Sequence, residues 1–375
     1  MKSPIELYLA KKITSENKIS FSEFMDIALF HKEYGYYTNK SQIFGDKGDF
    51  ITSPITSSLF GESISNEFIN LNSAEQPMNI LELGGGDASL AISLLKNLIQ
   101  KKSLPKKYII LEISNSLIEV QQRKIKEEIP ELYTLFSWTD SLESTKIKGL
   151  IIANEFFDAL PSERFRMRDG KTQKLYIKNH NNNFKHEWLP ATELLEKELD
   201  VAKNNHSILF PKNYISEINM QYKKWITNLD KCLESGVIFI IDYGYNAKEY
   251  FLEERNEGTL VCIHNHRANF DPLSHVGEQD LSTFVNFSHL TNITNETKIS
   301  VEGYMTQANF LINLGILDLF ENKKYNDDEK VIELNRLKNI LLPNTMGEIF
   351  KVLVLKKHIN NQLKATKEFN HMHKL

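Results

Sequence analysis

Apolar residues along this chain gather in short runs that predict buried strands. Such runs occupy residues 79–83, 108–114, 132–138, 149–153 and 236–244. Between them, residues 88–100 and 115–129 repeat their apolar positions at helical spacing, and Pro130 ends the second helix. Strands this apolar are buried on both faces, which is typical of a parallel sheet covered by helices. The chain is therefore predicted to have an α/β fold, with a mainly parallel sheet and helices on both faces.

Two regions depart from this alternation of strands and helices. Residues 1–76 predict a helical start, an amphipathic helix over 21–30 and then a turn-rich segment. Past residue 160, the pattern predicts strands at 164–167 and 174–178 and helices around 192–204 and 215–233. We therefore predict an N-terminal helical region over 1–76 packed on the core, a Rossmann-like core in two halves over 77–160 and 236–375, and an inserted α+β subdomain over 161–235.

Composition excludes several other classes of protein. A chain of 375 residues can bury a stable core without disulfide bonds or structural metal ions. Cys232 and Cys262 also lack the spacing of a zinc knuckle or a disulfide framework. A net charge of −4, from 45 basic and 49 acidic residues, argues against nucleic acid as a partner. No apolar run approaches the roughly 20 residues that span a bilayer, and the N-terminus lacks the apolar core of a signal peptide. We expect a cytoplasmic protein without a membrane span.

Polar clusters follow the predicted strands at their carboxyl ends. Glycines 84–86 follow the first strand, Glu112 lies at the end of the second, residues 154–158 follow the fourth, and Asp242 and Tyr243 end the fifth. In open parallel sheets, ligands bind outside the carboxyl ends of the strands, where the strand order reverses. The sequence therefore predicts a binding site at this edge of the sheet.

The glycine turn favours one cofactor over another. A dinucleotide loop of the form GxGxxG would need a third glycine where Ser89 stands, which weakens a nicotinamide interpretation. An acidic residue two places before the first glycine, here Glu82, is instead typical of the S-adenosylmethionine (SAM) loop. Gly84, Gly85 and Gly86 would let the backbone approach the cofactor, and Glu112 would accept both ribose hydroxyls. Trp138 would lie beneath the adenine or fill the core, and a merely flexible glycine turn is the alternative.

The segment Asn154–Asp158 suggests the acceptor side of a methyltransferase. Asn154 and Phe157 match the ends of the N-P-P-Y/F motif of nucleobase amino-methyltransferases, but neither proline is present. Alternatively, Glu155 and Asp158 would pair with a cationic acceptor such as arginine and orient its guanidinium. The third possibility is ordinary loop chemistry, with Glu155 solvated and Asp158 capping the next segment.

His264 and His266 alternate in a predicted strand and lie on one face of it. Two histidines in that arrangement could hold a metal ion, but no third ligand is near them in the sequence. No metal site is therefore predicted.

Several stretches together resemble the MidA family of SAM-dependent methyltransferases, also called DUF185, over nearly the whole chain. They are FMDIALFHKEYGYY (24–37), GDFITSPITSSLFGE (48–62), LELGGGDASL (81–90), LEIS (111–114), NEFFDALP (154–161), IDYG (241–244), HRANFDPLSHVGEQDLSTFVNF (266–287), GYMTQANFLINLGI (303–316) and MGEIFKVLVL (346–355). The family usually has proline at Gly85, glycine at Ala88 and glutamate at Ile55.

The resemblance implies a class I methyltransferase fold, SAM as methyl donor and methylation of a protein arginine. It places Gly84, Gly86 and Glu112 at the cofactor and Asn154, Glu155 and Asp158 on the acceptor side. It also implies a protein substrate, such as a subunit of a respiratory complex. A nucleobase methyltransferase and an assembly factor that binds SAM without catalysis remain the alternatives.

Overall fold

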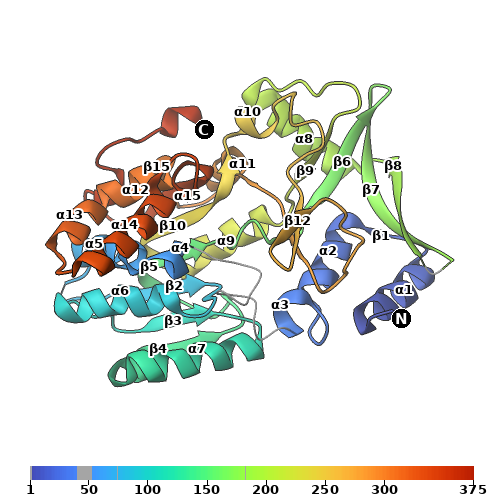
Figure 1. Ribbon diagram of the computed structural model, residues 1–375. Coiled ribbons are helices and arrows are strands. Elements are labelled where there is room, and N and C mark those ends of the chain that lie inside the picture. The colour runs from blue at the N-terminus through green and yellow to red at the C-terminus, as the bar shows by residue number, and fades with distance from the viewer. Residues whose placement is uncertain (1, 40–52, 74, 182) are drawn as a thin grey trace. The chain divides into compact units, whose positions relative to one another are not determined.

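The computed structural model describes residues 2–39, 53–73, 75–181 and 183–375, and it divides into two compact units (Figure 1). Unit 1 comprises Met1–Lys40, Asp158–Lys224 and Tyr245–Leu290, and unit 2 comprises Ser41–Phe157, Trp225–Gly244 and Thr291–Leu375. Residues 48–52, the start of the GDFITSP stretch, lie outside the described residues. Within those described ranges, no helix has both the length and the apolar character needed to cross a bilayer.

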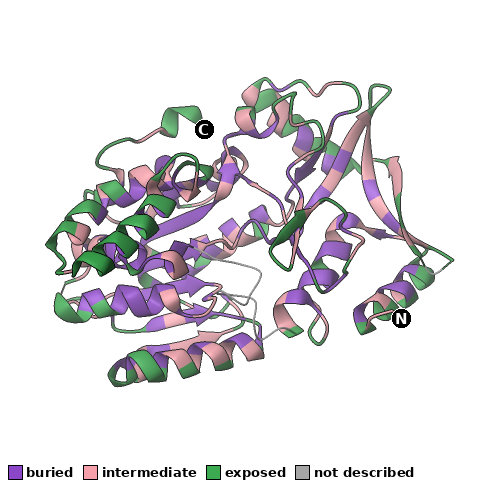
Figure 2. Cartoon of the chain, in the orientation of Figure 1, coloured by how far each residue is buried: buried purple, intermediate pink, exposed green. Residues whose placement is uncertain are grey.

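Unit 2 is built on a mainly parallel sheet with the strand order β15-β16-β10-β5-β2-β3-β4. These strands are β2 (Asn79–Leu83), β3 (Tyr108–Leu111), β4 (Phe136–Thr139), β5 (Ile147–Asn154), β10 (Leu233–Tyr245), β15 (Ser300–Thr306) and β16 (Phe350–Lys357). The five strands from β10 to β4 in this order run parallel, whereas β16 is antiparallel to both β10 and β15. Their apolar side chains are buried, as expected for strands covered on both faces (Figure 2).

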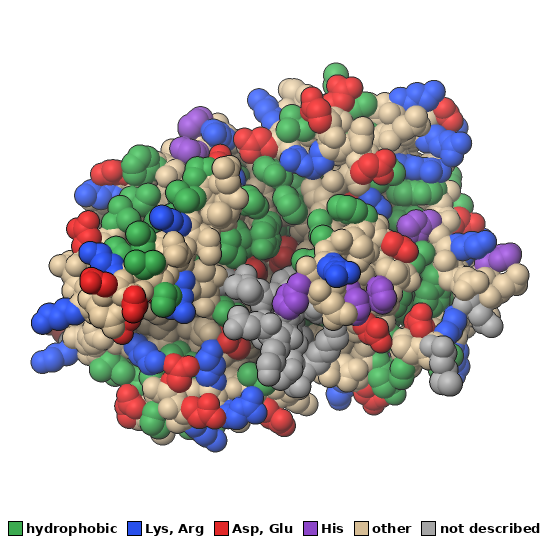
Figure 3. All heavy atoms as spheres, in the orientation of Figure 1, with side chains coloured by type: hydrophobic (Ala, Val, Ile, Leu, Met, Phe, Trp, Pro, Cys, Tyr) green, Lys and Arg blue, Asp and Glu red, His purple; other side chains and the backbone are tan. Residues whose placement is uncertain are grey.

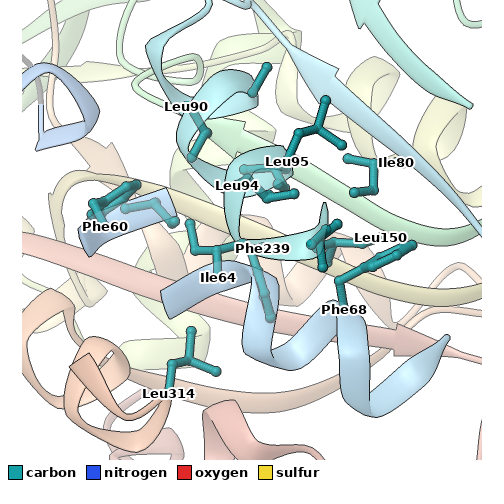
Figure 4. Packing of buried hydrophobic residues seen from close by; sticks show 14 of the residues in the cluster. Phe60, Ile64, Phe68, Ile80, Leu90, Leu94, Leu95, Leu150, Phe239 and Leu314 are labelled. Atoms are coloured by element: carbon teal, nitrogen blue, oxygen red, sulfur yellow. The ribbon is translucent and has the colours of Figure 1, made fainter. Parts of the chain in front are cut away.

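Helices supply the rest of the unit 2 core. They are α4 (Ser53–Thr56), α5 (Ser58–Leu71), α6 (Ser89–Gln100), α7 (Asn115–Glu128), α12 (Gln307–Asn313), α13 (Ile316–Asn322), α14 (Asp327–Leu341) and α15 (Met346–Ile349), while α9 (Tyr222–Cys232) and α11 (Phe287–Thr294) cross the division between the units. Figure 4 shows Phe60 and Ile64 of α5 packing with leucines of α6 and with Phe239 of β10. Helices α5 and α6 approach closely at Gly61, where a Cβ would overlap the hydroxyl of Ser93.

Unit 1 contains two small antiparallel sheets. In the first, the order is β1-β7-β6-β9 with β8 paired to β7, and in the second it is β12-β11-β13. The elements are α1 (Pro4–Glu16), β1 (Ile19–Ser20), α2 (Phe21–Phe30), α3 (Tyr36–Asn39), β6 (Glu163–Arg168), β7 (Lys171–His180), β8 (Asn183–Pro190), α8 (Glu193–His206), β9 (Ile215–Ile218), α10 (Ala247–Tyr250), β11 (Val261–His264), β12 (Arg267–Asn269), β13 (Asp280–Ser282) and β14 (Val285–Asn286). A separate core cluster, which includes Phe165, Leu199 and Tyr214, lies in this unit.

The structure divides the chain differently from the sequence-based prediction. Residues 245–290, predicted as core, belong to unit 1, where β11 pairs with β12 and β13 in a separate three-stranded sheet; β14, in the same range, pairs with β10. Helix α5, predicted in the N-terminal region, belongs to unit 2, where it packs on α6. Within the predicted helix over 215–233, the first four residues form β9 instead, because they pair with β6.

Candidate functional site

The carboxyl ends of β2, β3, β5 and β10 lie at one edge of the unit 2 sheet. These strands are parallel neighbours, and β2 lies between β3 and β5 although it precedes both of them in the chain. The strand order therefore reverses at β2, which is where ligands bind in open α/β sheets. All four sequence-predicted polar clusters lie at or near the carboxyl ends of these strands, and the parallel pairing brings these ends to the same edge.

The glycine turn after β2 uses backbone conformations that favour glycine. Gly84 has φ +70° and Gly86 has φ +51°, both in the left-handed region. Ala88 also has a positive φ, of 68°, at the position where the MidA family usually has its last glycine. At Gly85, a Cβ would lie 2.7 Å from Cγ2 of Ile110 on β3, so the side chain of Ile110 fills the space that a proline ring would need. A glycine at position 85 therefore fits beside Ile110 in this chain, where a larger residue would overlap it.

Glu112 lies directly after β3 and is almost fully buried. Its Oε1 accepts hydrogen bonds from the backbone N–H groups of Ile113 and Ser114, each at 2.9 Å. Burial raises the pKa of this carboxyl group, and the hydrogen bonds that it accepts oppose that shift. A carboxylate held in this way at a strand end suits the diol of a ribose, which offers two hydroxyl donors.

Gln121 connects three of the predicted cofactor residues, and the sequence-based prediction missed it. From α7, its side-chain amide donates hydrogen bonds to the backbone carbonyl of Gly86 at 3.0 Å and to Oε2 of Glu112 at 3.3 Å. Its carbonyl oxygen accepts a hydrogen bond of 2.7 Å from the indole N–H of Trp138. Gln121 is 0% exposed, so these partners replace water.

A signal for Gln121 was present in the sequence. The buried face of α7 consists of Leu117, Gln121 and Ile125, which repeat every fourth residue. A polar residue on an otherwise apolar helical stripe must find hydrogen-bond partners inside the protein. A search for such residues on the helix after the second strand would have identified it.

Glu82 and Trp138 make internal contacts in the structure. Oε2 of Glu82 accepts a 2.7 Å hydrogen bond from the hydroxyl of Tyr108, and burial raises the pKa of Glu82 to about 7. The ring of Trp138 stacks on Phe136, with centroids 6.0 Å apart. Their predicted contacts with the cofactor stay predictions. Lys124 of α7 forms an ion pair of 2.6 Å with Asp87, which follows the glycine turn.

Asn154 and Glu155 lie at the end of β5, on the predicted acceptor side. The amide of Asn154 donates to Oε1 of Glu155 at 3.2 Å. Among the residues that the structure describes, no hydrogen-bond donor reaches the buried Oδ1 of Asn154. Glu155 has φ 50°, a conformation that L-residues rarely adopt. An unsatisfied buried oxygen beside a strained residue is the kind of feature that accompanies binding sites.

Asp242 at the end of β10 fixes the backbone that follows Glu155. Its Oδ2 accepts hydrogen bonds from the N–H groups of Phe156 at 3.2 Å and Phe157 at 2.9 Å, and its Oδ1 accepts one from Tyr243 at 2.9 Å. Because Asp242 is 0% exposed, its role is to hold this segment in place.

Asp158, the third predicted catalytic residue, belongs to unit 1, whereas Asn154 and Glu155 belong to unit 2. Its environment includes the carboxylate of Asp280, which accepts a 2.8 Å hydrogen bond from the hydroxyl of Tyr37. Burial and, second, the charge of Asp280 raise the pKa of Asp158 to about 7. Its predicted catalytic role stays a prediction.

Three features together define a class I SAM-dependent methyltransferase. They are a parallel sheet whose strand order reverses at β2, a left-handed glycine turn after β2 and a buried acidic residue after β3. The model of the Methyltransf_28 family, described as "Putative S-adenosyl-L-methionine-dependent methyltransferase", matches residues 59–305. The chain belongs to this family. This result confirms the predicted fold, the resemblance to the MidA family and SAM as the cofactor.

Curated relatives and solved structures agree with this assignment. The chain is 25% identical to the mitochondrial protein arginine methyltransferase NDUFAF7 of Mus musculus, over 95% of this chain and 85% of the relative. It is 28% identical to the Drosophila melanogaster homolog, over 81% and 73% of the two chains. A Burkholderia thailandensis crystal structure with bound S-adenosyl-homocysteine has a TM-score of 0.93 at 26% identity, covering 100% of this chain and 99% of that chain. The cytoplasmic location expected from the sequence stays a prediction.

Proposed function

We propose that this methyltransferase acts on an arginine side chain of a protein. The observation that carries the proposal is the pairing of Asn154 and Glu155 at the same sheet edge as the cofactor loop. There, a buried amide oxygen without a donor among the described residues lies beside a carboxylate. The names of the curated relatives, which are protein arginine methyltransferases, support the same substrate class.

The chemistry of an arginine acceptor fits these two side chains. A guanidinium carries five N–H donors and stays protonated, so it needs oxygen acceptors and a compensating negative charge. Asn154 would offer its carbonyl oxygen and Glu155 its carboxylate, which would orient the attacking nitrogen.

When bound, SAM supplies a methyl group on a positively charged sulfur. As the new carbon–nitrogen bond forms and the carbon–sulfur bond breaks, the attacking nitrogen must lose a proton. The carboxylate of Glu155 is the group that we assign to accept it. The buried Glu112 and the glycine turn would hold the donor, so substrate and cofactor contacts come from different strand ends. Following the family resemblance, we propose a respiratory complex subunit as the acceptor protein.

The experiment is methyl transfer from radiolabelled SAM into a cell extract, followed by amino-acid analysis of the protein fraction. We expect labelled methylarginine with the wild-type enzyme and a large loss of label with Glu155→Gln. Calorimetric titration with S-adenosyl-homocysteine serves as the control, since Glu155→Gln should leave that affinity nearly intact. Label in the nucleic acid fraction, or on an amino acid other than arginine, would overturn the substrate class.

Glu155→Gly tests whether the strained backbone serves the side chain. Glycine adopts φ 50° without penalty, so the free energy of unfolding of this variant should be about 1 kcal/mol higher than that of the wild type. Methyl transfer should be lost. A variant that keeps full activity would show that the segment is an ordinary turn.

A further inference from the structure

His264, His275 and Glu278 come together in unit 1. His264 ends β11, and the other two lie on the loop that leads to β13. One potential ligand atom from each residue lies within 4.8 Å of the others. The predicted partner of His264 was His266, which is instead part of a turn with φ 60° and does not share a strand face with it.

The ring of His264 is already oriented as in many metal sites. Its Nδ1 lies 3.0 Å from the backbone carbonyl oxygen of Glu278. Because a carbonyl only accepts, Nδ1 carries the proton, and the lone pair of the neutral tautomer is on Nε2. Metal-binding histidines usually donate their other N–H to a carbonyl or carboxylate in this way. The lone pair on Nε2 accepts a hydrogen bond of 2.9 Å from the exposed amide of Asn265, which can exchange with solvent.

The loop that carries His275 and Glu278 is held in shape by the buried side chain of Gln279. Its amide donates to the carbonyl oxygens of Asp271 at 3.0 Å and Ser274 at 2.6 Å, and its own oxygen accepts from the side chain of Asn269 at 3.0 Å. The backbone N–H groups of Glu278 and Gln279 both donate to the carbonyl of His275. The loop therefore presents its side chains from a rigid base, which lowers the entropic cost of binding an ion.

We propose that His264, His275 and Glu278 bind a divalent transition metal of the zinc class. Two imidazole nitrogens and one carboxylate oxygen form a donor set that suits Zn²⁺, with water in the fourth position. Ligand atoms of a tetrahedral zinc site lie about 3.3 Å apart, so none of the three separations has to shorten by more than about 1.5 Å. The two rings, now stacked with centroids 4.2 Å apart and 8° between their planes, must open. The exposed position of His275 allows that rotation.

Exposed histidines are visible on the surface in Figure 3 (purple), so an ion from solvent has access to side chains of this kind. Binding would join the loop after β12 to the end of β11. The role of the ion is therefore to fix this loop, and no step of methyl transfer passes through it.

The test is titration of the purified full-length protein with Zn²⁺ in competition with a chromophoric chelator. We expect one tight equivalent in the wild type and at least about tenfold weaker binding in His264→Ala, His275→Ala and Glu278→Gln. His266→Ala is the matched control, because it removes a neighbouring exposed histidine that lies outside the cluster. It should bind zinc as the wild type does.

Thermal unfolding gives a second measurement. Saturating Zn²⁺ should raise the Tm of the wild type and of His266→Ala, and have little effect on His264→Ala and His275→Ala. Equal zinc affinity in the wild type and in these two variants would overturn the proposal. Wild-type protein that shows no zinc-dependent rise in Tm would do the same.

Discussion

Replacement of Gln121 by methionine tests whether one buried amide organises the cofactor side of the site. Methionine has a similar length and is apolar, so the change removes hydrogen bonds with little change in packing volume. It leaves Gly86 without one donor, Glu112 without one donor and Trp138 without its acceptor.

The expected loss follows from these three bonds. Two join neutral groups, for about 1 kcal/mol each, and the third reaches a carboxylate at the long distance of 3.3 Å. Gly86 and Trp138 are only half-buried, so water can replace part of what they lose. We therefore expect the free energy of unfolding to fall by about 2–3 kcal/mol. Because Glu112 and the glycine turn also lose a shared restraint, the affinity for S-adenosyl-homocysteine should fall at least about tenfold.

Urea denaturation and calorimetric titration measure the two effects separately. The control is Gln122→Met, the same substitution one residue further along α7, where the side chain points about 100° away from the network. The explanation is wrong if Gln121→Met loses no more stability than this control and binds S-adenosyl-homocysteine with unchanged affinity. Loss of stability alone would make Gln121 a purely structural residue.

Three further predictions concern other residues. Glu112→Ala should weaken S-adenosyl-homocysteine binding by about 1–3 kcal/mol through the loss of charged hydrogen bonds, and unchanged calorimetry would contradict this. The pKa of Asp158 is raised from 3.8 to about 7, so its folded state binds the proton more tightly than the unfolded chain does. Wild-type stability should therefore fall as pH rises from about 4 to 7, and urea denaturation at pH 5 and 8 should show a smaller fall for Asp158→Asn. Gly61→Ala should lower the free energy of unfolding by about 1–3 kcal/mol, because the added Cβ overlaps α6. The control Gly170→Ala, with φ +72° and open space around it, should lower it by only about 1 kcal/mol. Equal losses of stability would contradict the packing argument.

The parallel sheet could be predicted because its strands are buried on both faces. The apolar runs 149–153 and 236–244 lie within β5 and β10. Short, nearly continuous apolar runs of this kind are typical of strands that are covered on both faces. The residues of β9 were assigned to a helix because Ile215 and Ile218 also fit helical spacing. Their pairing with β6, more than 45 positions earlier in the chain, decides the structure and leaves no local signal.

The strand-end residues could be located from the sequence, but their contacts could not. Topology alone brings Gly84, Glu112 and Asn154 to one edge of the sheet. Gln121 lies on the buried stripe of α7, but its partners come from three different segments, so the sequence could not name them. Asp242 was placed at a strand end, but it binds backbone N–H groups, which every residue has. Side-chain contacts of this kind depend on three-dimensional packing that no periodicity records.

Two non-glycine residues in left-handed conformations follow the central strands of the sheet, and both bear on how the site is built. Ala88 and Glu155 have φ 68° and 50°, and each costs on the order of 1–2 kcal/mol relative to a relaxed backbone. At Ala88 the methyl group is fully buried in the main core, which offsets part of that cost. Glu155 has no such compensation from an apolar side chain, but Asp242 holds the two residues after it. The strained backbone of Glu155 is therefore held in place by hydrogen bonds to its neighbours, and its carboxylate lies beside an amide oxygen that has no donor among the described residues. This combination favours a substrate-binding role over a turn of arbitrary sequence.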